Sequence, residues 1–257
     1  MSRKQVAGSS KSSKPEKMGE VDTSKTSGSQ AKIKSRKSLH VLRKVFHALA
    51  GILMAASYEW IFTTQKDAIF FYAIFFALVA SCEIMRLYFL DSWISKFVFR
   101  FMSILARNYE LKQATGMVFF LAGVLSVIVL FPKKVAILAI LFLSFGDPLA
   151  SACGIKLGYL GPKFSNGKSL MGTFGGFLGC AITTFFYYRA EIGFNGVLLL
   201  VSLLGGFAGA IPETLCGRVH NGEGGPIDID DNLALPIGSG LIFYLLLHVF
   251  GLQSLMV

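Results

Sequence analysis

The first residues able to do chemistry form a basic cluster, Arg43, Lys44 and His47, at the start of the first long apolar run. Their spacing places the three side chains on one side of a helix. A guanidinium fork, an ammonium point charge and an imidazole together make a cationic clamp for phosphate groups. The alternative is that the cluster only supplies the positive charge that flanks a membrane span on its cytosolic side.

A lone carboxylate, Asp147, lies in the inner half of another apolar run and is followed directly by Pro148. Inserting a carboxylate into a membrane span is costly, so such a group normally faces a polar interior and has a partner. Proline at the next position disturbs the helical hydrogen-bond pattern and exposes backbone groups beside the acid. We therefore interpret Asp147 as either a metal ligand or a general base.

A glycine-rich segment follows and leads into the next apolar run. Its residues of interest are Gly154, Gly158, Lys168, Ser169 and Gly172. Glycines let the backbone approach a phosphate closely, and the N-terminus of the following helix favours its negative charge. The segment is not a P-loop, because five residues instead of four separate Gly161 from Gly167-Lys168-Ser169 and no strand precedes it. The alternative is that Gly172 and the glycines after it are small residues for helix packing.

An acidic cluster, Asp230, Asp231 and Asn232, precedes the last apolar run in a chain otherwise poor in acid. Carboxylates and an amide are hard oxygen ligands of the kind that Mg²⁺ and Ca²⁺ prefer. EF-hand spacing is absent, and the alternative is a solvated acidic loop. Elsewhere, Glu83 and Arg86 are spaced as a local ion pair on one helix.

The elements that position these groups are membrane spans. Of the 257 residues, 53% are hydrophobic and 16% are charged, whereas about 25% charged is usual in a soluble domain. Apolar runs long enough to cross about 30 Å of hydrocarbon alternate with short polar joints. We predict an all-α polytopic membrane protein with about seven transmembrane helices, in a range of six to nine. The predicted spans cover residues 45–62, 68–90, 114–131, 135–153, 170–188, 195–215 and 233–252.

Two segments are predicted to lie outside these spans. Residues 91–112 form an amphipathic helix that lies flat in the interface, or contribute a short further span. Residues 1–38 are rich in Ser and Lys with almost no large apolar side chain, so we expect a disordered basic tail in the cytosol. That tail is either a solvated arm or is attracted to anionic lipid. Residues 39–257 then make up a single membrane-embedded domain.

The distribution of charge bears on partners and on orientation. Residues 1–44 hold 12 Lys and Arg against 3 Asp and Glu, so most of the net charge of +10 belongs to this segment. A charge of this origin describes a basic arm and not a nucleic-acid groove, and no nucleic-acid partner is expected. The joints on the tail's side carry nine Lys and Arg and the opposite joints carry four. This asymmetry places the N-terminus and all the polar groups above in the cytosol.

These motifs, in this order, resemble one family over roughly residues 40–250. The residues that carry the resemblance are Arg43-Lys44-x-x-His47, Gly146-Asp147 with Ala150-Ser151, Gly154 and Gly158, Lys168-Ser169-x-x-Gly172-Thr173, Glu213, and Asp230-Asp231-Asn232 with Pro236. In them the chain is similar to the CTP-dependent polyprenol and lipid kinases, which include CTP-dependent diacylglycerol kinase, dolichol kinase and phytol kinase. The positions matching those that the family needs for activity are Arg43, Lys44, Asp147 and Gly154, and those matching its nucleotide-proximal loop are Lys168, Ser169 and Gly172.

The resemblance implies phosphoryl transfer from CTP to the hydroxyl of a membrane alcohol in the endoplasmic reticulum, with release of CDP. The compact length and the Asp-Asp-Asn run look most like the diacylglycerol kinase branch, whose product is phosphatidate. Pro148-Leu149 departs from the two small residues expected there.

Phosphoryl transfer needs positioned positive charge and a group that orients the acceptor hydroxyl. We therefore predict a catalytic group of Arg43, Lys44, His47 and Asp147, in which Asp147 orients or deprotonates the hydroxyl. The predicted nucleotide-binding residues are Gly154, Gly158, Lys168, Ser169 and Gly172, and the predicted ligands of Mg²⁺ or Ca²⁺ are Asp230, Asp231 and Asn232. At this stage Asp147 and the metal ligands can exchange roles.

Three alternatives stay open. The first is that the acceptor is dolichol or another polyprenol in place of diacylglycerol. Alternatively, the chain is a phosphatidate cytidylyltransferase, although it has His220-Asn221-Gly222 in place of that family's His-Gly-Gly and lacks its Asp-Arg-x-Asp. The third alternative is a transporter without catalysis, which would carry polar residues near the bilayer midplane and two similar halves with broken helices.

Overall fold

The computed structural model describes residues 44–88, 115–216 and 230–256 of the chain. Over these ranges nearly every residue outside the turns is helical, and the β-structure present there is a lone bridge between Lys163 and Ser169. The tail predicted over residues 1–38, the flat helix predicted over residues 91–112, and Arg43 lie outside the described residues.

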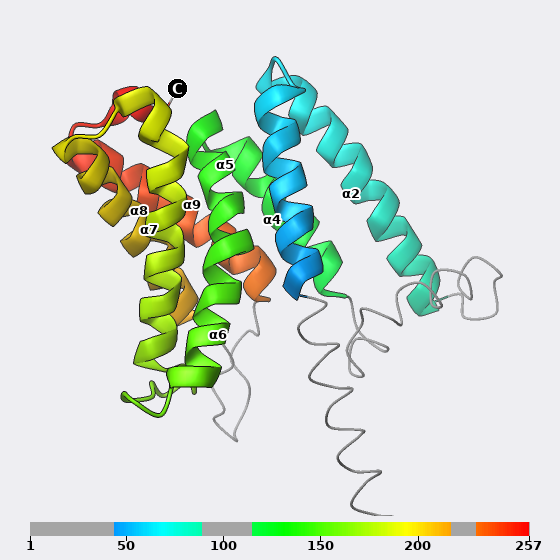
Figure 1. The fold of residues 1–257 in the computed structure, drawn as a ribbon. Coiled ribbons are helices and arrows are strands. Elements are labelled where there is room, and N and C mark those ends of the chain that lie inside the picture. Colours follow the sequence, from blue (N-terminus) through cyan, green and yellow to red (C-terminus); the bar gives the residue numbers. More distant parts are fainter. Residues whose placement is uncertain (1–43, 89–114, 217–229, 257) are drawn as a thin grey trace, which may run out of the picture. The chain divides into compact units, whose positions relative to one another are not determined.

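Seven long helical segments follow one another and coincide with the predicted spans to within a few residues (Figure 1). They are a helix over residues 44–60; α2 (Gln65–Tyr88); α4 (Gly116–Leu130); one continuous helix made of α5 (Lys133–Leu141), the π-helical turn η1 (Phe142–Gly146) and α6 (Asp147–Leu157); α7 (Leu170–Ile192); α8 (Gly196–Leu215); and α9 (Asp231–Val249), with the short η2 (Gln253–Met256) after it. Five of them are long and apolar enough to cross a membrane, and Gly116–Leu130 is a shorter apolar helix. The chain is thus an all-α polytopic membrane protein, as predicted.

Polar side chains cap the starts of α7, α8 and α9. Ser169 Oγ accepts a hydrogen bond from the N–H of Gly172 at 3.1 Å, and Asn195 Oδ1 accepts one from Leu198 at 3.0 Å. Asp230 Oδ1 accepts one from the N–H of Asn232 at 2.9 Å. Each cap satisfies an N–H group that a helix leaves unpaired in its first turn. Two of the predicted site residues therefore fix where helices begin.

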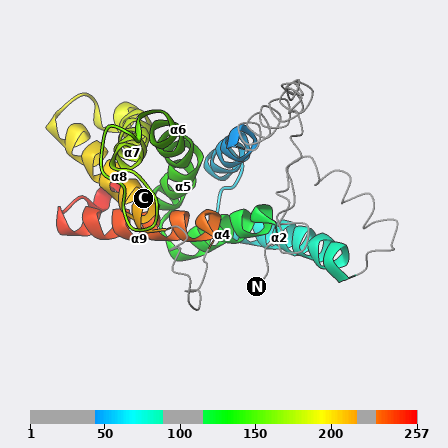
Figure 2. The same ribbon diagram turned by 90° about the horizontal axis from the view of Figure 1, so that it is seen from below.

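Glycines bring α7 into close contact with the helices on either side of it, α6 and α8 (Figure 2). A Cβ added to Gly175 would lie 2.6 Å from Cys153 Cβ, and one added to Gly179 would lie 3.4 Å from Gly146 Cα. A Cβ on Gly209 of α8 would overlap Cys180 Sγ. These glycines therefore serve helix packing, which was the alternative interpretation for those after Gly172.

The apolar core lies where α9 packs against α4, α5 and α8. Towards one end of it, Glu83 of α2 meets the start of α4, because its Oε1 accepts a hydrogen bond from the N–H of Thr115 at 2.7 Å. The same carboxylate pairs with Arg86 at 2.7 Å, and both side chains are buried. The predicted local ion pair is confirmed, and it also fixes the position of Thr115.

Candidate active site

A cavity of about 440 Å³ lies at one end of the described helices. Its lining includes the N-cap residues of three helices, namely Thr115, Ser169 and Asp230. A helix N-terminus carries a partial positive charge, so three of them at one cavity favour a bound anion before any side chain is counted.

Ten of the twelve residues predicted from the sequence line this cavity: Lys44, His47, Asp147, Gly154, Lys168, Ser169, Gly172, Asp230, Asp231 and Asn232. Arg43 lies outside the described residues. Gly158 is absent from the lining, and a Cβ added to it would lie 3.2 Å from Ser169 Oγ. Gly158 therefore packs beside the cap of α7 and does not face the cavity. The chemical roles of the other residues remain predictions.

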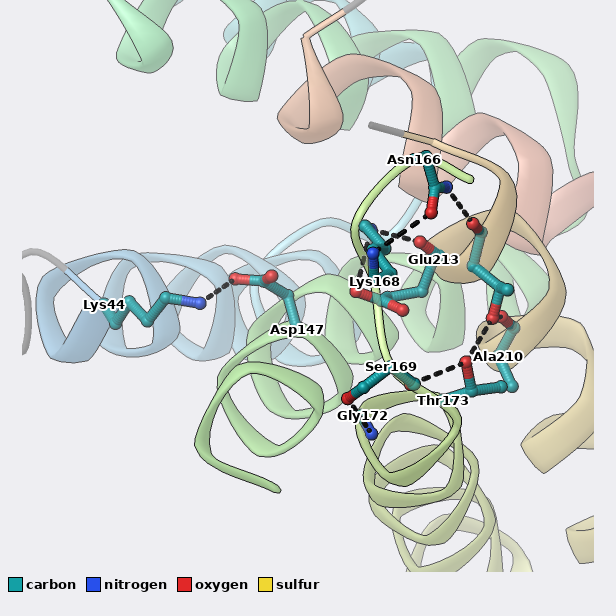
Figure 3. Close-up of polar contacts among 10 residues, drawn as sticks. Lys44, Asp147, Asn166, Lys168, Ser169, Gly172, Thr173, Ala210 and Glu213 are labelled. Atoms are coloured by element: carbon teal, nitrogen blue, oxygen red, sulfur yellow. Dashed lines mark hydrogen bonds and ion pairs between the residues drawn. The ribbon is translucent and has the colours of Figure 1, made fainter. Parts of the chain in front are cut away.

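Asp147 owes its position to the π-helical turn before it. Pro148 has no N–H to donate, and the wide turn η1 changes the hydrogen-bond pattern just before it while the helix continues through to Leu157. Asp147 Oδ2 accepts a hydrogen bond from Lys44 Nζ at 3.1 Å, and the two side chains are 34% and 20% exposed (Figure 3). The partner expected for a carboxylate within a span is thus Lys44, from the first described helix.

His47, one turn along the same helix, lines the cavity near this ion pair. Its ring packs edge-on against Phe120 of α4, with 5.4 Å between the ring centroids. The structure therefore places both the lysine and the imidazole of the predicted cationic clamp at the cavity.

The segment between α6 and α7 is a small hairpin that brings two lysines to the cavity. The N–H of Phe164 donates to Lys168 O at 2.7 Å, and the N–H of Leu170 donates to Pro162 O at 3.0 Å. The reversal needs Gly167, whose φ of +82° is favourable only for glycine. Lys163, opposite Ser169 in the bridge, and Lys168 both line the cavity. Sequence reasoning had not selected Lys163.

This hairpin is attached to the C-terminal end of α8. Lys168 Nζ donates to Glu213 Oε1 at 2.8 Å and also to the backbone carbonyl of Glu213. Asn166 Nδ2 donates to the carbonyl of Thr214 at 2.7 Å (Figure 3). The two side chains thereby satisfy carbonyl groups that the last turn of a helix leaves unpaired. The Ser165-Asn166-Gly167 run is a turn signal that would have identified Asn166, whereas nothing in the sequence marks Thr214.

Gly154 and Gly172 allow α6 and α7 to meet at Ser169. A Cβ on Gly172 would lie 3.1 Å from Ala150 O, and one on Gly154 would lie 3.3 Å from Ser169 Oγ. Larger residues would push the two helices apart at the cavity wall. Both glycines line the cavity, so close packing and close approach to a ligand are compatible there.

The acidic cluster has a structural role in addition to its predicted one. Asp230 Oδ1 accepts from both the N–H and the Nδ2 of Asn232, at 2.9 and 2.8 Å. Asn232 Nδ2 also donates to Gly116 O at 3.4 Å, which joins α9 to α4. Within residues 44–88, 115–216 and 230–256, no group of three or more His, Cys, Asp or Glu gathers to hold a metal ion.

The donor atoms at this cluster nevertheless fit a hard cation. Asp230 and Asp231 both line the cavity, and their side chains carry carboxylate oxygens. Mg²⁺ is usually held by one or two carboxylates together with water and substrate phosphates, and not by a cage made wholly of protein groups. Two adjacent carboxylates beside a cavity suited to phosphates match that arrangement.

The chain is similar to several curated proteins. A protein named CTP-dependent diacylglycerol kinase 1 from Schizosaccharomyces pombe is 29% identical over 156 residues, which are 56% of this chain and 65% of that protein. The protein of the same name from Saccharomyces cerevisiae is 25% identical over 230 residues, 81% of this chain and 73% of that protein. An uncharacterised protein from Rickettsia prowazekii is 31% identical over 150 residues, 56% of this chain and 66% of that protein.

The match spans a little less than two thirds of the Schizosaccharomyces pombe protein. No model of a protein family matches the chain, and no solved structure matches it. The similarity to relatives that share one name extends over much of the chain. The comparisons therefore support the predicted resemblance to the CTP-dependent diacylglycerol kinases.

Proposed function

We propose that the protein transfers the γ-phosphoryl group of CTP to the hydroxyl of diacylglycerol, forming phosphatidate and CDP. The observation that carries this proposal is the cavity at one end of the membrane-spanning helices, which is lined by three lysines, by the N-caps of three helices and by carboxylate residues. The named relatives support the choice of CTP and diacylglycerol. The proposed setting is the endoplasmic reticulum membrane, with the N-terminus and the cavity on the cytosolic side.

The phosphate side of the reaction needs positive charge in fixed positions. Lys44, Lys163 and Lys168 line the cavity together with the N-terminus of α7. Charge of this kind stabilises the equatorial oxygens as the phosphoryl group moves between donor and acceptor, and it needs no rearrangement at that moment.

The acceptor side is proposed to depend on Asp147. Its carboxylate lines the cavity, is about one third exposed, and is held in place by Lys44. In the proposed reaction the lipid hydroxyl donates its proton to Asp147 while its oxygen attacks the γ-phosphorus. The bond from that phosphorus to the bridging oxygen breaks, and CDP leaves with the electron pair. A positioned base of this kind contributes about 10²- to 10⁴-fold to the rate.

Asp230 and Asp231, with Asn232 beside them, are the residues that would hold a divalent cation, and Mg²⁺ suits this donor set better than Ca²⁺ because it needs fewer protein ligands. When bound, the cation would neutralise charge on the β- and γ-phosphates. The capping hydrogen bonds of Asp230 would keep both carboxylates at the cavity wall.

The test uses the purified protein in mixed micelles with γ-labelled CTP and Mg²⁺, supplied with either diacylglycerol or dolichol. We expect label on diacylglycerol, and a loss of about 100-fold or more in the Asp147→Asn variant. Asp67→Asn is the matched control, because Asp67 is an exposed aspartate in the first turn of α2 and does not line the cavity.

Each other outcome has a definite meaning. Label on dolichol alone would change the acceptor to a polyprenol. Release of pyrophosphate with formation of a cytidine-diphosphate lipid would indicate a cytidylyltransferase. No labelled lipid from a protein shown to be folded would refute the kinase proposal and favour a transporter.

A further inference from the structure

The three lysines of the cavity do not have the same surroundings. Lys44 is paired with Asp147 at 3.1 Å, and Lys168 is paired with Glu213 at 2.8 Å. Lys163 lines the same cavity, is exposed, and has no ion pair with any residue that the structure describes. Two of the three charges are therefore already balanced by a carboxylate, and the third is available to a ligand.

The hairpin holds Lys163 at the N-terminus of α7. Lys163 lies opposite Ser169 in the antiparallel bridge, and the two flanking backbone bonds join Phe164 to Lys168 and Leu170 to Pro162. Ser169 is the N-cap of α7 and also lines the cavity. The lysine side chain thus starts next to a helix N-terminus that itself favours an anion.

The attachment to α8 keeps this arrangement rigid. Lys168 bonds the carboxylate and the carbonyl of Glu213, and Asn166 bonds the carbonyl of Thr214. Two consecutive residues of α8 therefore hold the hairpin through the residues on either side of Gly167. Lys168, which the sequence suggested as a phosphate ligand, thus also holds the hairpin in place.

We infer that Lys163 is the residue that binds the phosphates of the nucleotide, with the Lys168–Glu213 pair as the positioning element beneath it. The inference rests on the proposed function for the identity of the nucleotide. The ligand chemistry is that of a nucleoside triphosphate, whose oxygens accept hydrogen bonds from the ammonium group and are attracted by the partial positive charge at the N-terminus of α7.

The test measures equilibrium binding of radiolabelled CTP with Mg²⁺ to the full-length protein in detergent micelles. Lys163→Gln should weaken binding about tenfold, the size of one lost charge-assisted hydrogen bond, and Lys163→Arg should restore most of it. Lys156→Gln is the matched control, because Lys156 is an exposed lysine near the end of α6 that does not line the cavity. When CMP is the competitor, the affinities of wild type and Lys163→Gln should differ less than they do for CTP, because CMP carries fewer phosphates.

Wild-type affinity in a folded Lys163→Gln protein would overturn the inference, and so would an equal loss for CTP and CMP. Binding does not need phosphoryl transfer, so the two proposals fail separately. Lys163-dependent binding without any labelled lipid would refute the kinase and keep this site. Labelled lipid together with normal CTP binding by Lys163→Gln would keep the kinase and refute the Lys163 site. A wild-type protein that does not bind CTP would refute both the kinase and the Lys163 site.

Discussion

Replacing Glu213 by Gln tests whether the hairpin between α6 and α7 depends on its attachment to α8. The carboxylate of Glu213 is 10% exposed and accepts from Lys168 Nζ at 2.8 Å. Gln keeps the shape and an acceptor oxygen but loses the charge. A charge-assisted hydrogen bond is about twice as strong as a neutral one, so Gln should weaken the attachment of the hairpin by about 1 kcal/mol, which corresponds to a roughly fivefold change in an equilibrium constant. Ala removes the acceptor as well, and the loss becomes about 1.5–3 kcal/mol.

We expect the weaker attachment of the hairpin to reduce the apparent affinity for the nucleotide. The KM for CTP should rise about fivefold in Glu213→Gln and roughly 10- to 100-fold in Glu213→Ala, while kcat and the KM for the lipid change little. Steady-state kinetics with each substrate varied in turn provide the measurement. Glu191→Gln is the control, because Glu191 pairs with Lys134 at a similar 2.9 Å but is more exposed and lies outside the cavity lining.

A double variant decides whether Glu213 acts through Lys168. If it does, Glu213→Gln combined with Lys168→Met should be no worse than Lys168→Met alone, because the first change has nothing left to remove. Losses that add in the double variant would refute this reasoning and assign Glu213 a direct contact with the nucleotide. An equal rise in both KM values would refute it as well, since it would indicate general damage to the fold.

Three further changes have expected outcomes that can be measured directly. Glu83→Ala should lower the free energy of unfolding by about 3–5 kcal/mol, because it breaks an ion pair buried on both sides and the bond to Thr115; denaturant unfolding in detergent measures it, and a loss below about 1 kcal/mol would contradict the assignment. Gly123→Ala should cost about 1–3 kcal/mol and reduce activity, because its Cβ would lie 2.5 Å from Asn232 O, whereas Gly196→Ala has open space and should be tolerated. Burial raises the pKa of the Cys216 thiol, Asp231 and Glu213 raise it further, and Lys168 lowers it. In a variant whose only cysteine is Cys216, maleimide labelling at pH 8 should therefore be slower than labelling of a free thiol, and Lys168→Met should slow it again. A labelling rate that Lys168→Met leaves unchanged would show that Lys168 does not face Cys216.

The order of the helices and the gathering of the site at one end of them were predictable from the sequence. Run length fixes which segments span a membrane, and each span reverses the direction of the chain. The groups around Lys44, Asp147, Lys168 and Asp230 are separated by even numbers of reversals or lie at the same end of a span. They therefore had to meet at one end, and the structure places them in one cavity.

The pairing of these groups was not predictable. Lys44 and Asp147 are 103 positions apart, and Lys168 and Glu213 are 45 apart, so their contact depends on how helices are rotated and packed. Hydrophobic periodicity specifies a face of a helix but not its neighbour. Gly158 shows the same limit, because a glycine that packs against a cap and one that admits a ligand look alike in sequence.

The exposure of each lysine explains why its role differs from those of the others. A cation that is mostly removed from water needs a partner, since an unpaired buried charge costs several kcal/mol. Lys44 and Lys168 are only 20% and 22% exposed, and each has a carboxylate. Lys163 lies on an exposed hairpin, where water solvates it until a ligand arrives. Among the three lysines of the cavity, the two less exposed ones therefore hold the cavity together, and the exposed one remains available to exchange water for phosphate.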